Sequence, residues 1–263
     1  MSKSGNITFT LSGERILPKM FMILVGIEIF LVLLDVIVNY GKFTDIGALR
    51  RLCNIAREDG VATYFAATQT LFAGLTAMLV YVVSKQMGKA KKETIGWLII
   101  ALFFMYMAVD DASQIHERVG TAFKTIADRG DGGLLWSWLH LSPSYSWQVV
   151  VLPVFVGVGL YISYFLWVEL KAGRSKILVF LALAFMGTAV VLDFIEGLHK
   201  DHPLNIYTHI KELYDLRSYT VSHFAKVIEE FLEMLSISTF WIVFSAHFFS
   251  LLKEVSIRIE SGS

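Results

Sequence analysis

The sequence predicts an all-α fold: a polytopic membrane helix bundle of six transmembrane spans with one interfacial amphipathic helix. Hydrophobic residues make up 55% of the 263 residues and the mean hydropathy is +0.59, which is more apolar than an ordinary soluble domain. Six apolar stretches reach the roughly 20 residues that a helix needs to cross the hydrocarbon of a bilayer. The predicted spans are residues 18–40, 61–86, 95–117, 147–170, 177–199 and 221–252.

The first half of the chain shows how these elements follow one another. A polar tail precedes the first span, which lacks a small-residue cleavage site and is therefore expected to remain as a membrane span. Within this span Glu28 and Asp35 are seven residues apart and so share one helical face. Glu28 lies deeper, and it either joins a site from below or pairs within the bundle. Residues 41–60 mix apolar and basic side chains, which predicts the interfacial helix.

The second half continues the pattern. A basic linker leads into the third span, whose last residues are strongly polar, and a loop with glycines and tryptophans follows. In the fourth span Pro153 with Gly157 and Gly159 predicts close packing or a kink. The connections are too short for a second domain, so residues 1–263 are expected to form a single integral membrane domain.

Composition excludes several classes of function. Lys and Arg number 23 and so do Asp and Glu, so no net positive charge attracts nucleic acid. Cys53 is the only cysteine, which rules out an internal disulfide and a cysteine-based zinc site. The chain has no CxxCH haem motif, no glycine-rich nucleotide loop and no G-x-S-x-G nucleophile motif. The expected partner is the lipid bilayer, with other membrane subunits as a further option.

The distribution of basic residues predicts the orientation. Lys and Arg concentrate in the tail, in the linker between spans two and three, and in the turn between spans four and five. Such residues mark the cytoplasmic side. We therefore expect a multi-pass protein of the cell inner membrane with both termini cytoplasmic. The polar ends of spans three and five and the polar start of span six then face outward at one depth.

These three polar ends predict a metal site near the outer surface. Crowded carboxylates in a medium of low dielectric constant repel one another, and a divalent cation removes that cost. Mixed carboxylate and imidazole ligands suit iron, manganese or zinc, and imidazole also suits copper. The predicted ligands are Asp110, His116, Glu117, Glu196, His199, Glu230 and Glu233. We expect four further residues either to form hydrogen bonds to these ligands or to act as alternate ligands: Asp111, Asp193, His223 and Glu229.

Helical spacing supports this choice of ligands. Asp110 and Glu117 are seven residues apart, which places them on one face of a continuous helix. Glu196 and His199 have the Glu-x-x-His spacing with which helix bundles bind pairs of iron or manganese ions. A redox metal would favour oxidation or desaturation of a lipid-like substrate, whereas zinc would favour hydrolysis through an activated water. Whether the protein is an enzyme stays open at this point.

Three other interpretations compete with the metal site. Each polar end could simply be a solvated helix terminus. The acids could also form an ion-pair network with Lys226 or Arg118, as in a non-catalytic accessory subunit of a larger membrane complex. A cation or proton-coupled transporter is the third interpretation. It predicts acids that continue toward the inner side, and the sequence has few of them beyond Glu28.

The same residues carry a resemblance to a family. The motifs are REDGVATYFAATQ at residues 57–69, AVDDASQIHE at residues 108–117 and IEEFLEML at residues 228–235. In these motifs the chain resembles a family of uncharacterised bacterial multi-pass membrane proteins. That family has a Ser-Leu-Asp-Glu…His-Glu segment and a Glu-Glu…Glu-Met segment, and Asp111 stands where its pattern has glutamate. The resemblance implies a shared site and no particular reaction.

Overall fold

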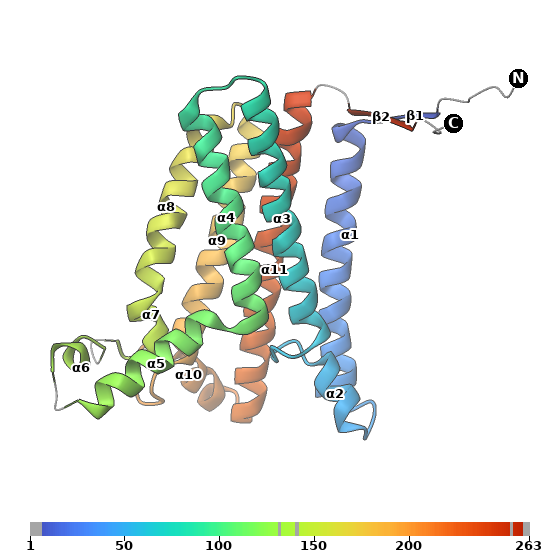
Figure 1. The fold of residues 1–263 in the computed structure, drawn as a ribbon. Helices are drawn as coiled ribbons and strands as arrows, with labels where there is room; N and C mark the ends of the chain where they lie inside the picture. The colour runs from blue at the N-terminus through green and yellow to red at the C-terminus, as the bar shows by residue number, and fades with distance from the viewer. Residues whose placement is uncertain (1–6, 131–132, 140–141, 253–254, 260–263) are drawn as a thin grey trace, which may run out of the picture.

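A computed structural model describes residues 7–130, 133–139, 142–252 and 255–259. Its main body is a bundle of long helices that stand side by side (Figure 1). In the part of the chain that is described, six helices are long and apolar enough to cross a membrane, so the chain is a multi-pass membrane protein that contacts lipid. They are α1 (Gly13–Leu34) with its π-helical continuation η1 (Asp35–Tyr40), α3 (Val61–Gln86), α4 (Lys91–Ser113), α8 (Leu152–Glu169), α9 (Gly173–Glu196) and α11 (Ser218–Leu252).

Short elements lie at the two ends of this bundle. Five short helices gather at the lower end in Figure 1: α2 (Gly47–Cys53), α5 (Ile115–Arg129), α6 (Leu134–Leu139), α7 (Ser146–Val150) and α10 (Ile206–Leu213). At the other end β1 (Ile7–Leu11) pairs in antiparallel fashion with β2 (Val255–Ile259). The predicted helix bundle is confirmed, while this two-stranded ribbon was not foreseen. It places the first and last described segments at the same end.

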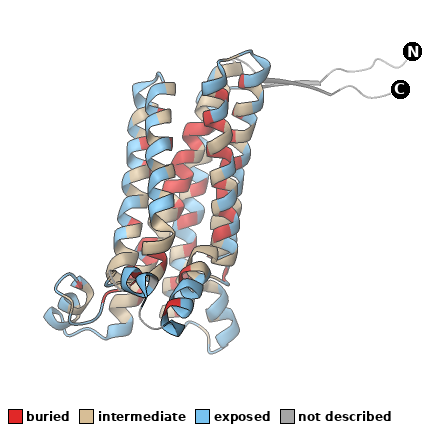
Figure 2. Cartoon of the chain, turned by 60° about the vertical axis from the view of Figure 1, so that its left-hand side comes forward, coloured by how far each residue is buried: buried red, intermediate tan, exposed pale blue. Residues whose placement is uncertain are grey.

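Helix α11 is the centre of the bundle. Residues 236–240 are consecutively buried, which requires neighbours on all sides of the helix. The core around it is aromatic: the ring of Phe104 lies 5.5 Å from that of Phe240 and 5.1 Å from that of Phe244. Figure 2 shows the buried residues on the middle helices, whereas the outer faces are exposed. Exposed side chains such as Met22, Ile23 and Phe30 are apolar, as expected of a surface that faces lipid.

Two predicted spans end earlier than expected. Span three was predicted to continue to Glu117, but α4 ends at Ser113 because Gln114 adopts a left-handed conformation with φ of 56°. The chain then turns into α5, which carries Glu117 in its first turn. Span five was predicted to reach His199, but α9 ends at Glu196. Both corrections move predicted ligands off the helix faces on which the spacing had placed them.

Span four shows a further difference. It divides into α7 and α8 around Val151, with Pro153 in the first turn of α8, so the predicted kink lies at the start of the span. The predicted close packing at Gly157 and Gly159 is wrong, because a Cβ atom at either position would meet nothing within 4 Å. Close approaches occur at other glycines: Gly96 of α4 packs against Phe165 of α8, and Gly120 of α5 packs against α7. A Cβ atom at Gly120 would lie 2.5 Å from the backbone nitrogen of Trp147.

We therefore expect Gly120→Ala to destabilise the protein by about 1–3 kcal/mol, since the added methyl group forces a backbone shift in a packed region. Gly157→Ala is the matched control, because its methyl group has free space. Thermal unfolding of both variants in the same detergent measures the difference. Equal midpoints for the two variants would contradict the close contact between α5 and α7.

Candidate functional site

The lower end of the bundle brings together carboxylates from several helices and one loop. Their charges act on one another across α4, α5, α9 and α11, as the prediction of a common depth requires. We call this group the acidic cluster. It consists of Glu58, Asp111, Glu117, Asp193, Glu196, Glu229, Glu230 and Glu233.

Lys226 lies within the acidic cluster. Its Nζ atom is 2.6 Å from Oε1 of Glu229 and 3.6 Å from Oε1 of Glu230. This ammonium group thus contacts two of the three glutamates that α11 contributes to the cluster. The second carboxylate oxygen of Glu229 has no hydrogen-bond partner, although this side chain is only 4% exposed. The predicted ion pairing by Lys226 is therefore present, and it leaves one carboxylate oxygen of Glu229 without a partner.

The break after α4 brings His116 back onto Asp110. Oδ1 of Asp110 accepts the backbone N–H of His116 at 2.9 Å, and its Oδ2 lies 2.6 Å from Nδ1 of the imidazole ring. Burial by itself would lower the pKa of His116, but the hydrogen bond and charge of Asp110, together with nearby carboxylates, raise it above its ordinary value. This contact holds the ring by Nδ1 and leaves Nε2 for another partner.

His199 does not join the acidic cluster. Since α9 ends at Glu196, the Glu-x-x-His face that the spacing predicted does not form. The His199 side chain is 79% exposed, and its Nδ1 lies 3.4 Å from a carboxylate oxygen of Asp201. The assignment of His199 as a ligand on the face of Glu196 is therefore wrong for this arrangement of the helix.

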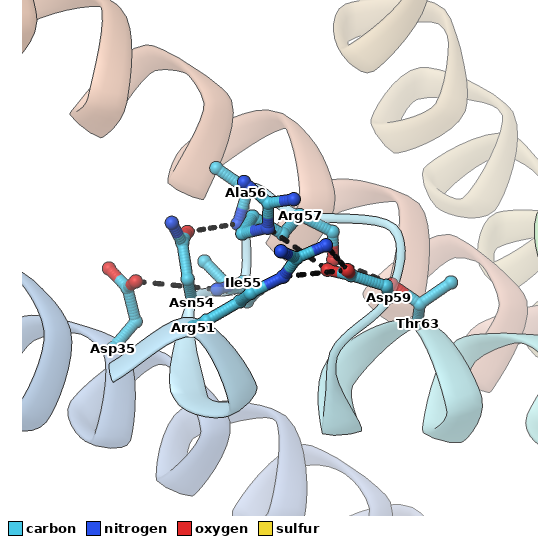
Figure 3. Close-up of polar contacts among 8 residues, drawn as sticks. All are labelled: Asp35, Arg51, Asn54, Ile55, Ala56, Arg57, Asp59 and Thr63. Atoms are coloured by element: carbon cyan, nitrogen blue, oxygen red, sulfur yellow. Dashed lines mark hydrogen bonds and ion pairs between the residues drawn. The ribbon is translucent and has the colours of Figure 1, made fainter. Parts of the chain in front are cut away.

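His223 belongs to a separate buried pair with α1. Its Nε2 lies 2.7 Å from Oδ2 of Asp35, and the rings of Tyr40 and Tyr219 stack on the imidazole. Oδ1 of Asp35 accepts hydrogen bonds from Nδ2 of Asn39 at 2.9 Å and from the backbone N–H of Ile55 at 3.3 Å. Figure 3 shows the contact between Asp35 and Ile55. His223 thus fastens α11 to α1 and to the loop that follows α2.

The loop between α2 and α3 positions Glu58, which the sequence analysis did not select. Arg51 and Arg57 both bind the carboxylate of Asp59 (Figure 3). Their hydrogen bonds lower the pKa of Asp59 to about 2. Burial, aided by the charges of Glu117 and Glu230, raises the pKa of the adjacent Glu58 to about 7. The signal for this loop in the sequence was the motif REDGVATYFAATQ at residues 57–69, which contains Glu58.

A polar hollow next to Glu58 opens to the surface. Its volume is about 550 Å³, and its walls include Arg57, Glu58, Gln114 and Arg118. Arg118 is exposed there. Because Glu58 lines the hollow and its pKa is affected by the charge of Glu230, the hollow lies beside the acidic cluster.

Gln148 and Tyr145 add polar groups from the α7 region. Nε2 of Gln148 donates to Oδ2 of Asp193 at 2.9 Å, while its Oε1 is buried without a partner. Burial, together with the charges of Glu196 and Asp193, raises the pKa of Tyr145 to about 12. At neutral pH the Tyr145 hydroxyl therefore keeps its proton and can donate a hydrogen bond.

The carboxylates are close in space but are not arranged as a finished metal site. Among the described residues, no group of three or more His, Cys, Asp or Glu side chains has an arrangement that could hold a metal ion as it stands. The structure therefore brings together most of the predicted ligands without their assembling into a coordination shell.

The sequence model of one protein family matches most of the chain. It is described as a domain of unknown function (DUF8692), and the match covers residues 22–248. No curated protein and no solved structure matches the chain. The acidic cluster and the pair of Asp35 with His223 both lie inside the matched range.

We expect the acid strength of Glu58 to make stability depend on pH. Its carboxyl titrates near pH 7 in the folded protein and near 4.5 as an unperturbed group, so the folded state binds more protons between these values. The stabilising contribution of Glu58 to the free energy of unfolding is fully present below about pH 4.5 and is lost as the pH rises through about 7. Thermal unfolding should show a smaller pH dependence over this range for Glu58→Gln than for the natural chain, and identical profiles would contradict the assignment.

The buried pair of Asp35 and His223 should be strongly coupled. His223→Ala leaves the fully buried carboxylate of Asp35 without its imidazole partner, which should cost about 3–5 kcal/mol of stability. Asp35→Asn combined with His223→Ala should cost less than the sum of the single changes. A double-mutant cycle by unfolding in detergent tests this, and additive costs would show that the two side chains are independent.

Proposed function

Because the chain belongs to the DUF8692 family, which is described only as a domain of unknown function, we propose a function from its own site. The protein is an integral membrane protein that binds a divalent metal ion, iron or manganese, in the acidic cluster. The observation that carries this proposal is the imbalance of charge around Lys226. A single lysine contacts Glu229 and Glu230, and Glu233 and Asp111 add further negative charge.

Physical chemistry leaves few ways to neutralise this charge. Carboxylates that crowd in a low-dielectric region must take up protons, acquire cationic partners or bind a metal. The unpartnered oxygen of Glu229 is an acceptor without a donor, which is what a site for a positive ion would contain. A bound ion would have to draw the carboxylates together, since they are not preassembled.

His116 supports the metal proposal in a second way. Histidines that bind a metal through one ring nitrogen usually donate the other N–H to a carboxylate, which fixes the orientation of the ring. The contact between His116 and Asp110 has this form. One imidazole among several carboxylates favours iron or manganese over copper, and Glu196, Glu230 and Glu233 are the proposed carboxylate ligands.

The position of the acidic cluster favours chemistry at the membrane surface. Asp111 lies in the last turn of α4, Glu117 in the first turn of α5 and Glu196 at the end of α9, and these helix ends are at the lower end of the bundle (Figure 1). The polar hollow at Glu58 opens to the surface there. A bound metal would supply either redox chemistry or an activated water. A metal-dependent oxidoreductase or hydrolase that acts on a lipid-like substrate is therefore the proposed class of enzyme.

The proposed location is the inner membrane of a bacterial cell. The tail, the linker between α3 and α4 and the turn between α8 and α9 carry the basic residues, and they share one end of the bundle with β1 and β2. By the positive-inside rule this end is cytoplasmic. Both termini then face the cytoplasm, and the acidic cluster faces the other side.

A second candidate function is favoured by the contacts of Lys226. Lys226 pairs with Glu229 and Glu230 of its own helix, and its charge also acts on Glu58 and on Glu196 of α9, so it is the centre of an ion-pair network that links α11 to its neighbours. In that case the protein is a non-catalytic subunit of a larger membrane complex, and no metal is needed.

Elemental analysis of protein purified in detergent without chelator separates these functions. For the metal site we expect stoichiometric iron or manganese in the natural chain and a loss of at least tenfold in Glu230→Gln. Glu14→Gln is the control, because Glu14 is an exposed glutamate at the opposite end. Lys226→Met should keep or increase the metal content, because it removes a competing cation.

The ion-pair network predicts the reverse pattern. No stoichiometric metal would then be found in any variant, and Lys226→Met would lower the unfolding temperature more than Glu230→Gln does. That result would overturn the metal proposal.

A further inference from the structure

A second polar site lies inside the bundle, away from the acidic cluster. Glu28 of α1, Gln69 of α3 and Ser238 of α11 meet there, and all three are buried. Nε2 of Gln69 donates to Oε1 of Glu28 at 2.9 Å, and Oγ of Ser238 donates to the same oxygen at 2.6 Å. The amide of Gln69 also contacts the hydroxyl of Ser238. Three helices that are distant in sequence are thus joined at one carboxyl group.

The site lies deep in the membrane-spanning part. Glu28 is fifteen residues beyond the first residue of α1, Gly13, and therefore about 22 Å along the helix axis at 1.5 Å per residue. That distance is about half the length of the 28-residue span Gly13–Tyr40, about 42 Å at 1.5 Å per residue, and so places Glu28 near the middle of a bilayer whose hydrocarbon is about 30 Å thick. An ionised carboxylate at such a depth is costly unless a positive partner accompanies it.

No positive side chain faces Glu28 from the helices that pack against it. Its hydrogen-bond partners among the described residues, Gln69 and Ser238, are both uncharged. On α3 the one charged residue is Lys85, sixteen positions from Gln69. The titratable groups nearest along α11 and along α1 with its continuation η1 are the acids Glu233 and Asp35, and Lys19 lies nine positions from Glu28. Among the described residues the carboxyl group therefore has no ion-pair partner.

Two oxygen atoms of this site lack a hydrogen-bond donor. Oε2 of Glu28 and Oε1 of Gln69 are both buried without a partner. If both are bare acceptors, two oxygens lack a donor where burial makes that expensive. A proton on Oε2 turns the carboxyl group into a donor, and the amide oxygen of Gln69 is the acceptor that is available. The acid and the amide then pair through two hydrogen bonds in opposite directions.

We propose that Glu28, Gln69 and Ser238 form an intramembrane proton-binding site, in which the proton resides on Oε2 of Glu28 and is shared with Oε1 of Gln69. A calcium ion in the same place would need about six to eight oxygen ligands, whereas two oxygens lack partners here. The proton satisfies both with one atom and removes the charge. The site does not depend on the metal proposed for the acidic cluster.

The neighbouring residue of α3 links this site to the acidic cluster. Oγ1 of Thr70, the residue after Gln69, donates to Oδ2 of Asp111 at 3.2 Å. Asp111 belongs to the acidic cluster, and the polar hollow lies beside this cluster. The proton-binding site therefore lies beside the acidic cluster. Adjacent residues of α3 contact the two sites, Gln69 the proton-binding site and Thr70 the acidic cluster.

Infrared difference spectroscopy of the full chain in lipid nanodiscs tests the proposal at neutral pH. Subtracting the spectrum of Glu28→Gln from that of the natural chain should reveal the carbonyl stretch of one protonated carboxyl group. Glu14→Gln, which changes an exposed glutamate of the same helix, should give no such band. Glutamine preserves the shape of the acid and its ability to donate to Gln69, so we expect this variant to fold.

Gln69→Leu provides a second readout that does not require removal of Glu28. The carboxyl band should persist in this variant and shift to the frequency of a more weakly hydrogen-bonded acid. This measurement decides the question if Glu28→Gln does not fold. An unshifted band in Gln69→Leu would overturn the sharing of the proton.

Sodium is the alternative occupant that the experiment must separate. Thermal unfolding in sodium chloride and in choline chloride at equal ionic strength should give the same midpoint if a proton occupies the site. A sodium-dependent rise in the midpoint of the natural chain that Glu28→Gln abolishes, or the absence of a protonated carboxyl band at Glu28, would overturn the proposal.

Discussion

The crowding of carboxylates around Lys226 is the constraint on which the lower end of this bundle depends. Helix α11 brings Glu229 and Glu230 to the same lysine, and other helices and a loop add further acids. Such a group is stable only if positive charge or protons accompany it. The packing of the helix ends, the polarity of the adjoining loop and the chemistry open to the protein all follow from how that charge is neutralised.

The structure uses three different ways to accommodate its buried acids. Asp35 and Asp110 each contact an imidazole ring, and these contacts hold elements together. Glu229 contacts a lysine through one oxygen only. Glu28 contacts neutral groups alone. The pair of Asp35 with His223 is therefore a structural contact, the contact of Asp110 orients His116, and the groups with unpartnered oxygens are those that can take up an ion or a proton.

Local backbone geometry decides which histidine takes part. The left-handed residue Gln114 stops α4 and folds His116 back toward Asp110. A continuous helix would have carried His116 away from Asp110, because residues six apart do not share a face. The end of α9 at Glu196 has the opposite consequence, since it releases His199 into solvent. Two short departures from helical geometry thus select the side chains that the acidic cluster can use.

The sequence by itself determined the number of membrane helices and the end of the bundle at which acids gather. Hydropathy and charge act residue by residue along the chain, so long apolar stretches and their polar boundaries are visible without coordinates. The selection of Asp110, Glu230 and Glu233 needed only this local information, as did the suggestion that Lys226 forms ion pairs. The residues at which the helices end were harder to predict from the sequence, because a single residue in the left-handed conformation, such as Gln114, does not stand out in the hydropathy pattern.

Only the tertiary structure decided which polar groups meet. Glu28 and Ser238 form a hydrogen bond although they are 210 positions apart in the sequence, and Asp35 and His223 form one although they are 188 positions apart. Such pairings depend on the rotation and depth of each helix against its neighbours, and hydropathy does not encode these quantities. For the same reason the motif at residues 57–69 did not show that Glu58 lies close to Glu117 and Glu230. The sequence thus determines at which helix ends acidic side chains gather, and the packing of the helices determines which of these side chains contact one another.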